Sequence, residues 1–204
     1  MAITLFHVAG SRSLRVRWLL EELDLPYELE TYALGSKDMK TPAFREKSPL
    51  GKVPALHDGD LKLHESGAIV SYLLETYGEG RFEPERGSPE RALFHQWMWF
   101  AEGTLMPPLG EIIANSFVLP KEDRSEVIRK HARTRFGRAL KLLDGELESR
   151  DYLLESGFSA ADIMTVMGIQ LAKNLGELPE GLPQVEAYLA RTTARPAFQR
   201  ASAD

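Results

Sequence analysis

Cysteine is absent from this 204-residue chain. Without it, the chain can form no disulfide, bind no metal through thiolates and use no cysteine nucleophile. Any sulfur chemistry would need sulfur supplied by a ligand. The sequence also lacks an apolar run of about 18 residues, the length a membrane-spanning helix needs. The opening stretch, MAITLFHVAG, lacks the basic start and long apolar core of a secretory signal. We therefore expect a cytoplasmic protein with no membrane partner.

An excess of basic charge is also missing. The chain has 25 Lys and Arg against 30 Asp and Glu, a formal net charge of −5, so we expect no nucleic-acid partner. Its five histidines do not stand at the i, i+4 helical spacing of a metal site with a further His or carboxylate ligand. We predict no metal and read the histidines as structural or solvated.

Strand and helix patterns alternate in residues 1–80. Apolar runs in ITLFHV and YELETYAL predict strands, and between them apolar residues recur at i, i+3, i+4 and i+7 from Val16, as on a helix. Leu14 and Trp18 lie on the other side of this helix, so it should be covered on both sides. DGD between VPALH and LKLH predicts a hairpin, because Asp-Gly tolerates positive φ. A helix follows, so the order is βαβ-ββα.

Residues 81–88 belong to a stretch rich in Gly, Pro and charge, which predicts a linker. Residues 89–204 look helical, with a bend at Pro107-Pro108. SAADIMTVMGIQLAKNL is apolar nearly all round and should be the buried centre of a helical domain. Ser159 and Asp162 precede it in a capping-box pattern, with Asp in place of Glu. The chain therefore reads as an α/β domain fused to an all-α helical bundle.

Four segments carry a family resemblance: GSRSLRVRWLLEEL, SPLGKVPAL, LHESGAIVSYL and FSAADI. In this order and spacing they resemble the cytosolic glutathione transferases, in a serine-type, bacterial-like form, over essentially the whole chain. The resemblance implies a thioredoxin-like domain in residues 1–80 that binds glutathione, a linker at 81–88, and a helical domain in 89–204 that contributes the hydrophobic substrate site. It also implies a homodimer and glutathione chemistry of the kind used in detoxification.

The glutathione site is expected around the predicted hairpin. The resemblance implies a cis bond before Pro54 and backbone pairing of Val53 with the extended tripeptide. Glu65 can accept from the ligand ammonium, Ser66 and the helix start can hold its γ-glutamyl carboxylate, and Lys52 can take the glycine carboxylate. Singly, each feature has an ordinary reading: Pro54 suits an edge strand, and Glu65 and Ser66 are favourable in a first helical turn.

The thiol needs an activator, because a free thiol with a pKa of about 8.5 is only slightly ionised at neutral pH. Ser11, in the loop after the first strand, is the residue that aligns with the activating serine of serine-type members. Ser13 is the competitor, and its ordinary role would be the N-cap of the helix. Arg12 between them either stabilises the thiolate by its charge or is solvated. Phe6 and His7 stand where tyrosine-type members carry their tyrosine.

The second substrate, a small hydrophobic electrophile, is expected against Trp99, Met106 and Phe117, although such side chains are more often plain core. Glu102 is a candidate to reach the glutathione of a partner subunit, or else is an ordinary surface charge. The predicted activity is addition of the glutathione thiolate to the electrophile. The alternatives are a glutathione-dependent peroxidase, isomerase or dehalogenase, and a non-catalytic glutathione-binding or scaffold protein of the same fold.

Overall fold

A computed structural model describes residues 3–203 of the chain. The described residues form two compact units. The first comprises the residues up to Glu83 together with those from Thr193 onward, and the second is Pro84–Thr192. The last helix of the sequence therefore belongs with the N-terminal unit, which the helical pattern of residues 89–204 does not reveal.

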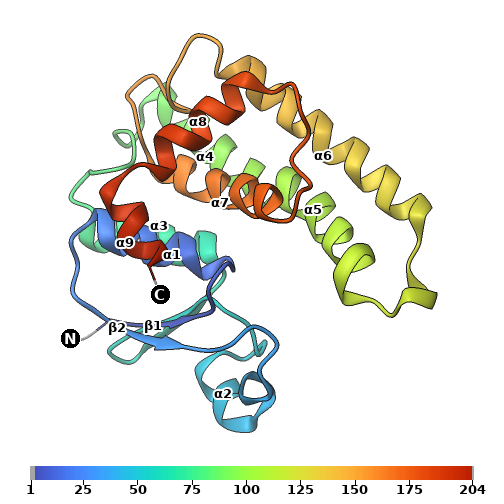
Figure 1. Cartoon of the computed structure of the whole chain (residues 1–204). Helices are drawn as coiled ribbons and strands as arrows, with labels where there is room; N and C mark the ends of the chain where they lie inside the picture. Colours follow the sequence, from blue (N-terminus) through green and yellow to red (C-terminus); the bar gives the residue numbers. More distant parts are fainter. Residues whose placement is uncertain (1–2, 204) are drawn as a thin grey trace. The chain divides into compact units, whose positions relative to one another are not determined.

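The first unit is built on a four-stranded sheet (Figure 1). Its strands are β1 (Ile3–His7), β2 (Tyr27–Thr31), β3 (Ala55–Asp58) and β4 (Leu61–His64), in the spatial order β2-β1-β3-β4. β1 is parallel to β2 and antiparallel to β3, and β3 and β4 form the predicted hairpin. Gly59 in its turn has a φ of 58°, a conformation that glycine adopts without a steric penalty. The predicted thioredoxin-like arrangement is confirmed.

Helices lie on both faces of this sheet (Figure 1). One face carries α1 (Ser13–Glu22) and α3 (Ser66–Tyr77), each through a buried apolar stripe. The other carries the short 3₁₀ segment η1 (Lys37–Lys40) and α2 (Pro42–Lys47). In α2, Phe44 meets Phe6 of β1 edge-on, with ring centroids 6.5 Å apart.

The outer side of α1 is covered by α9 (Pro196–Ser202). The Trp18 ring is fully buried and meets Phe198 edge-on, with centroids 4.8 Å apart. Arg195, at the N-cap of α9, forms a bidentate ion pair with Glu22 at 2.6 and 2.8 Å. The prediction that this helix is covered on both sides is therefore confirmed.

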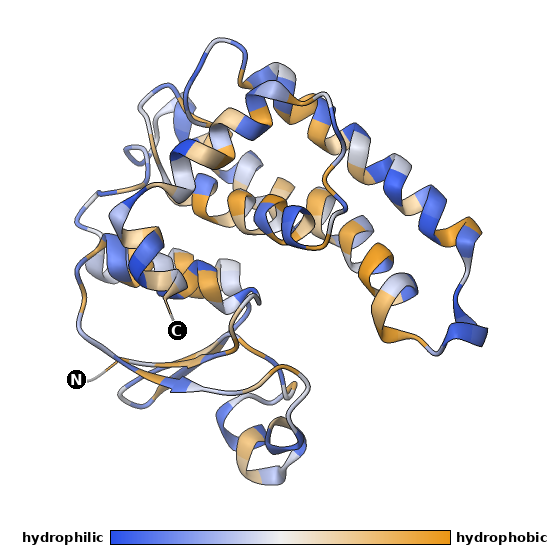
Figure 2. Ribbon diagram, in the orientation of Figure 1, coloured by the Kyte–Doolittle hydropathy of each residue, from blue (hydrophilic) through white to orange (hydrophobic). Residues whose placement is uncertain are grey.

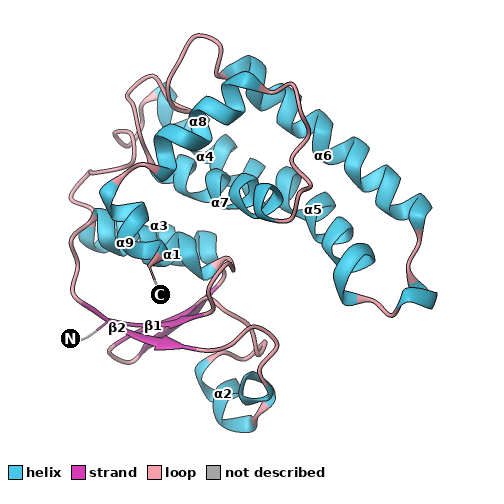
Figure 3. Cartoon of the chain, in the orientation of Figure 1, coloured by secondary structure: helices cyan, strands magenta, loops and turns pink. Residues whose placement is uncertain are grey.

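The second unit is all helical (Figure 3). Its elements are α4 (Pro89–Phe100), η2 (Ala101–Leu105), α5 (Met106–Ile113), η3 (Ala114–Val118), η4 (Lys121–Asp123), α6 (Glu126–Glu146), α7 (Ala160–Asn174) and α8 (Pro183–Thr193). The segments η2 and η3 are π-helical. The widened turn of η2 directly precedes Pro107, which has no N–H and would clash with the carbonyl one turn back in a regular α-helix.

Helix α7 forms the centre of this unit, and α6 packs through one apolar face. Hydrophilic and hydrophobic residues alternate along α6 in Figure 2, as on a helix with one solvated side. The capping box at the start of α7 is confirmed. Asp162 accepts from the Ser159 backbone N–H at 2.7 Å, from Leu153 N–H at 3.0 Å and from the Tyr188 hydroxyl at 2.8 Å.

Among residues 3–203, no helix is long and apolar enough to cross a membrane. No group of three or more His, Asp or Glu side chains in the same range could hold a metal ion.

Candidate active site

The strand register brings two candidate loops together. Phe6 of β1 pairs with Ala55 of β3 in the antiparallel ladder, so the end of β1 lies beside the start of β3. The loop that follows β1 carries Ser11, and the loop that precedes β3 carries Val53. The loops that carry the proposed thiol activator and the proposed backbone anchor therefore adjoin the same end of the two central strands.

The loop before β3 is fixed by local contacts. Ser48 is fully buried and its hydroxyl donates to the Lys52 carbonyl at 2.6 Å. Gly51 has a φ of 64°, and a Cβ there would lie 3.1 Å from the Met39 carbonyl oxygen, so this position requires glycine. The peptide bond between Val53 and Pro54 is cis. Val53 is half-buried and Lys52 is exposed.

Glu65 and Ser66 stand at the start of α3. Glu65 is exposed and has φ 71° and ψ 111°, a region that non-glycine residues rarely occupy and that is found mainly at functional sites. Ser66 is buried, and its hydroxyl accepts from Nη1 of Arg15 at 3.1 Å. That bond ties the N-terminus of α3 to α1. The first N–H groups of α3 have no partner within the helix, which favours an anion there.

Ser11, Ser13 and His7 form a hydrogen-bonded group at the start of α1. The Ser11 and Ser13 hydroxyl oxygens are 2.8 Å apart, and the Ser13 hydroxyl is 2.8 Å from Nδ1 of His7. The Ser13 side chain is fully buried, whereas Ser11 is half-buried and Arg12 is exposed. The N-cap reading of Ser13 is wrong: Arg12 is the N-cap, and the Ser13 N–H donates to the Ser11 hydroxyl at 3.2 Å.

The predicted electrophile residues lie on three elements of the second unit. Trp99 of α4 is 73% exposed and Phe117 of η3 is 53% exposed. Met106 of α5 is only 2% exposed, and a Cβ added at Gly168 of α7 would lie 3.1 Å from its sulfur. Glu102 is half-buried within η2.

Two buried residues near these loops were not singled out from the sequence. The sequence pattern gives His7 only a structural or solvated role, and it gives Arg15 no role of its own. The sequence pattern could have indicated their burial. His7 shares a strand face with Ile3 and Leu5, and Arg15 lies one residue from Val16 on the covered side of α1. Both are polar residues within an apolar pattern beside a candidate loop.

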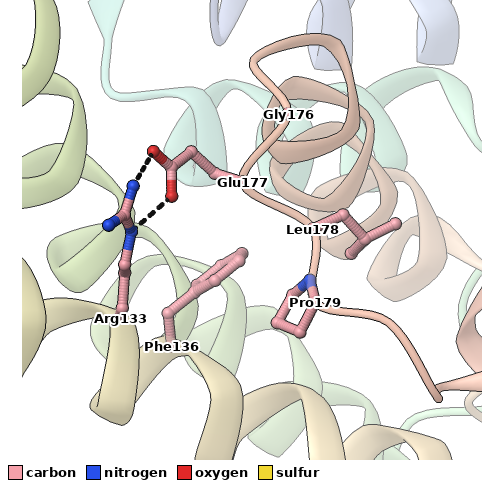
Figure 4. A pocket seen from close by; sticks show the side chains of 6 residues that line it. All are labelled: Arg133, Phe136, Gly176, Glu177, Leu178 and Pro179. Carbon is pink, nitrogen blue, oxygen red and sulfur yellow. Dashed lines mark hydrogen bonds and ion pairs between the residues drawn. The ribbon is translucent and has the colours of Figure 1, made fainter.

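A separate pocket of about 310 Å³ lies in the second unit, between α6 and the segment that follows α7 (Figure 4). Arg133 and Glu177 form a bidentate ion pair on its rim at 2.6 and 2.7 Å, and Phe136 and Pro179 supply apolar surface. Within the pocket lining, these two charges pair with each other.

Two family models match the chain. Residues 1–75 match the model described as glutathione S-transferase, N-terminal domain, and residues 105–196 match glutathione S-transferase, C-terminal domain. Together they cover most of the sequence. The N-terminal model matches the α/β part of the chain and the C-terminal model matches mainly the helical part.

Individual relatives agree with these models. Glutathione S-transferase 3 of Schizosaccharomyces pombe is 32% identical over 78% of this chain and 70% of its own length. Glutathione S-transferase 4 of Zea mays is 30% identical over 89% of this chain and 82% of its own. A crystal structure of a Pseudomonas putida glutathione transferase, with one glutathione disulfide bound per subunit, superposes with a TM-score of 0.87. That structure is 28% identical and the match covers 98% of this chain and 90% of the other.

Proposed function

The chain belongs to the glutathione S-transferase family, and we propose that it binds glutathione in its first unit, ionises the thiol and adds the thiolate to a hydrophobic electrophile. The observation that carries this proposal is that the Ser11 loop and the Val53–Pro54 loop adjoin the same end of the central strands β1 and β3, together with the bond from Arg15 to Ser66. Within one unit these segments supply the Ser11 hydroxyl, the backbone of Val53 for pairing with a peptide, and the N-terminus of α3 for binding an anion.

Each end of glutathione has a proposed partner. The exposed Glu65 carboxylate accepts from the γ-glutamyl ammonium, and Ser66 with the free N–H groups of α3 binds its carboxylate. Val53 pairs with the tripeptide backbone as an added strand would. Lys52, exposed beside it, binds the glycine carboxylate.

Ser11 is the proposed activator of the thiol. The burial of Ser13 supports this choice, since its hydroxyl already contacts His7, Val8 and Ser11 inside the fold. A hydroxyl that donates to sulfur, together with the N-terminus of α1, stabilises the anionic form and lowers the thiol pKa. Arg12, exposed next to Ser11, adds positive charge on the solvent side.

The electrophile is assigned to the second unit, with the exposed Trp99 and Phe117 and the buried Met106 as candidate contacts. The thiolate displaces a leaving group from the electrophile or adds to a conjugated double bond, so a carbon–sulfur bond forms. A homodimer in which Glu102 approaches the partner's glutathione completes the proposal.

The thiol pKa of bound glutathione is the test. Thiolate absorbance, titrated across pH, should give a pKa at least one unit below about 8.5 in the parent protein. Ser11→Ala should bind glutathione but lose that shift, and Ser71→Ala, an exposed serine within α3, should keep it. Glutathione binding with an unshifted thiol in the parent would instead support the non-catalytic binding protein.

A second candidate function is thiolate attack on a disulfide. The glutathione disulfide in the Pseudomonas putida relative favours it. In that reaction, the thiolate of bound glutathione attacks one sulfur of a mixed disulfide, a new sulfur–sulfur bond forms, and the other sulfur leaves as a thiolate. Parallel assays with an aryl halide and a mixed disulfide of glutathione separate the two, since only the first yields a carbon–sulfur product.

A further inference from the structure

The Ser13 hydroxyl is a hydrogen-bond junction between His7 and Ser11. Four groups surround its oxygen: the Val8 N–H at 3.1 Å, the Val8 carbonyl at 3.2 Å, Nδ1 of His7 at 2.8 Å and the Ser11 hydroxyl at 2.8 Å. A hydroxyl has one proton to donate and two lone pairs that accept. The Val8 N–H can only donate, so it occupies one lone pair. One proton and one lone pair remain for the other neighbours.

The tautomer of His7 decides how these remaining places are filled. If Nδ1 is bare, Ser13 donates to it, and the second lone pair of Ser13 accepts the Ser11 proton. The Ser11 proton then points inward. If Nδ1 carries a proton, His7 fills the second lone pair, and the Ser13 proton goes to Ser11 or to the more distant Val8 carbonyl. The Ser11 proton is then released to point outward.

The outward arrangement is the one a thiolate requires. Ser11 then accepts from the Ser13 hydroxyl and from the Ser13 N–H, the latter at 3.2 Å, while its own proton is left to donate. A hydrogen bond to an anion is about twice as strong as one between neutral groups. A bound thiolate therefore favours protonated Nδ1: in that state the Ser11 proton is not needed by Ser13, whereas with Nδ1 bare a bond from Ser11 to sulfur costs the bond from Ser11 to Ser13.

We propose that His7 is a positioning residue for Ser11: by donating from Nδ1 to the buried Ser13 hydroxyl, it directs the Ser11 proton at the thiolate of bound glutathione. This inference rests on the proposed function. His7 lies on β1, is 1% exposed, and acts through Ser13 without touching the ligand sulfur.

Variants of His7 test the proposal through the thiol pKa. His7→Leu fills a similar volume but cannot donate, so the pKa of the bound thiol should rise by about one unit, a tenfold loss of thiolate relative to thiol. His7→Asn can place an amide N–H near the position of Nδ1 and should restore most of the shift. Glutathione affinity measured at a pH where the thiol is protonated should stay within about twofold of the parent in both variants, because neither changes a proposed ligand contact.

A double-mutant cycle shows whether His7 acts through Ser11. Once Ser11→Ala has removed the hydroxyl, adding His7→Leu should raise the thiol pKa no further. Additive shifts would overturn the proposal, as would a His7→Leu protein with the parent thiol pKa. A parent protein without a lowered thiol pKa contradicts the proposed function itself, so the two failures are distinguishable.

The unmodified protein provides a readout that does not depend on any variant folding. In protein labelled with ¹⁵N-histidine and saturated with glutathione above the thiol pKa, the His7 Nδ1 resonance should be that of a protonated ring nitrogen. A bare Nδ1 in that complex would overturn the proposal. The ring-nitrogen resonances of His57 serve as the internal comparison in the same spectrum. His57 lies on the neighbouring β3, with its Nε2 3.1 Å from the Lys47 carbonyl oxygen.

Discussion

Ser13 shows how one residue can carry a role that its sequence position does not suggest. A serine before a helical run is normally an N-cap, yet here it lies inside the first turn and contacts the end of β1 through His7 and Val8. Its hydroxyl fastens the helix start to the strand. Ser11, in the loop before the helix, is only half-buried and can face the ligand. We therefore assign thiol activation to Ser11.

Arg15 provides the first prediction at this scale. Its Nη1 donates to the Ser66 hydroxyl, so that hydroxyl is oriented to donate its own proton to a ligand carboxylate. Arg15→Gln and Ser66→Ala should each weaken glutathione binding about tenfold, or ~1.4 kcal/mol. Calorimetric titration of the double variant should give nearly the loss of Ser66→Ala alone. Arg17→Gln, on the same helix but bonded to Ala203, is the control; additive losses would refute the coupling.

Asp162 gives a pH prediction. Burial raises the pKa of its carboxyl from 3.8 to about 6, although hydrogen bonds from Leu153, Ser159 and Tyr188 oppose the shift. Between pH 3.8 and about 6 the folded state binds more protons than the unfolded state. The contribution of this carboxyl to the free energy of unfolding therefore falls as pH rises through that range. A shift of about two units corresponds to about 3 kcal/mol.

The test compares the parent with Asp162→Asn, which cannot titrate. The variant is less stable at both pH values because its amide N–H groups face backbone donors. Denaturant unfolding should show that this cost is larger at pH 4 than at pH 7 by about 2 kcal/mol. A pH-independent cost would mean that the carboxyl does not titrate in this range.

At the scale of elements, α9 is held on α1 by arginines in different environments. Arg195 pairs with Glu22, whose side chain is 7% exposed and also accepts from the Trp18 indole N–H. Arg200 pairs with Glu21, and that arginine side chain is half exposed. Arg195→Ala leaves a nearly buried carboxylate without its cation and should cost about 2–3 kcal/mol of unfolding free energy.

Arg200→Ala is the matched control on the same helix. Its ion pair with Glu21 is exposed to solvent, so Arg200→Ala should cost clearly less unfolding free energy than Arg195→Ala. Chemical denaturation of both variants checks the order. Equal costs would show that the burial of Glu22 does not determine the strength of the contact.

At the scale of the whole molecule, the first unit is discontinuous in sequence. Its strands and first helices precede the second unit, whereas α9 follows it. A chain truncated after Ala194 would lack α9 and uncover the Trp18 ring, which Phe198 now contacts. It should melt at a lower temperature and show red-shifted tryptophan emission. Trp18→Phe in both chains assigns the emission change, and an unchanged melting temperature would contradict this role of α9.

Local patterns predicted much of the fold. The Asp-Gly turn, the capping box at Ser159 and the apolar periodicity of α1 act between residues a few positions apart, so their physics is contained in the sequence. The same holds for the segments around Val53 and Glu65, whose motifs carried the family resemblance. The order of the two folds followed from these elements.

The sequence by itself therefore determined which elements form, in what order, and that a ligand must supply any thiol, since the chain has no cysteine. Only the tertiary structure decided which distant residues meet: His7 with Ser13, Arg15 with Ser66 and α9 with α1. These contacts depend on strand register and on the packing of helices across the sheet. Both are set by the summed burial of many side chains, and no local pattern specifies them.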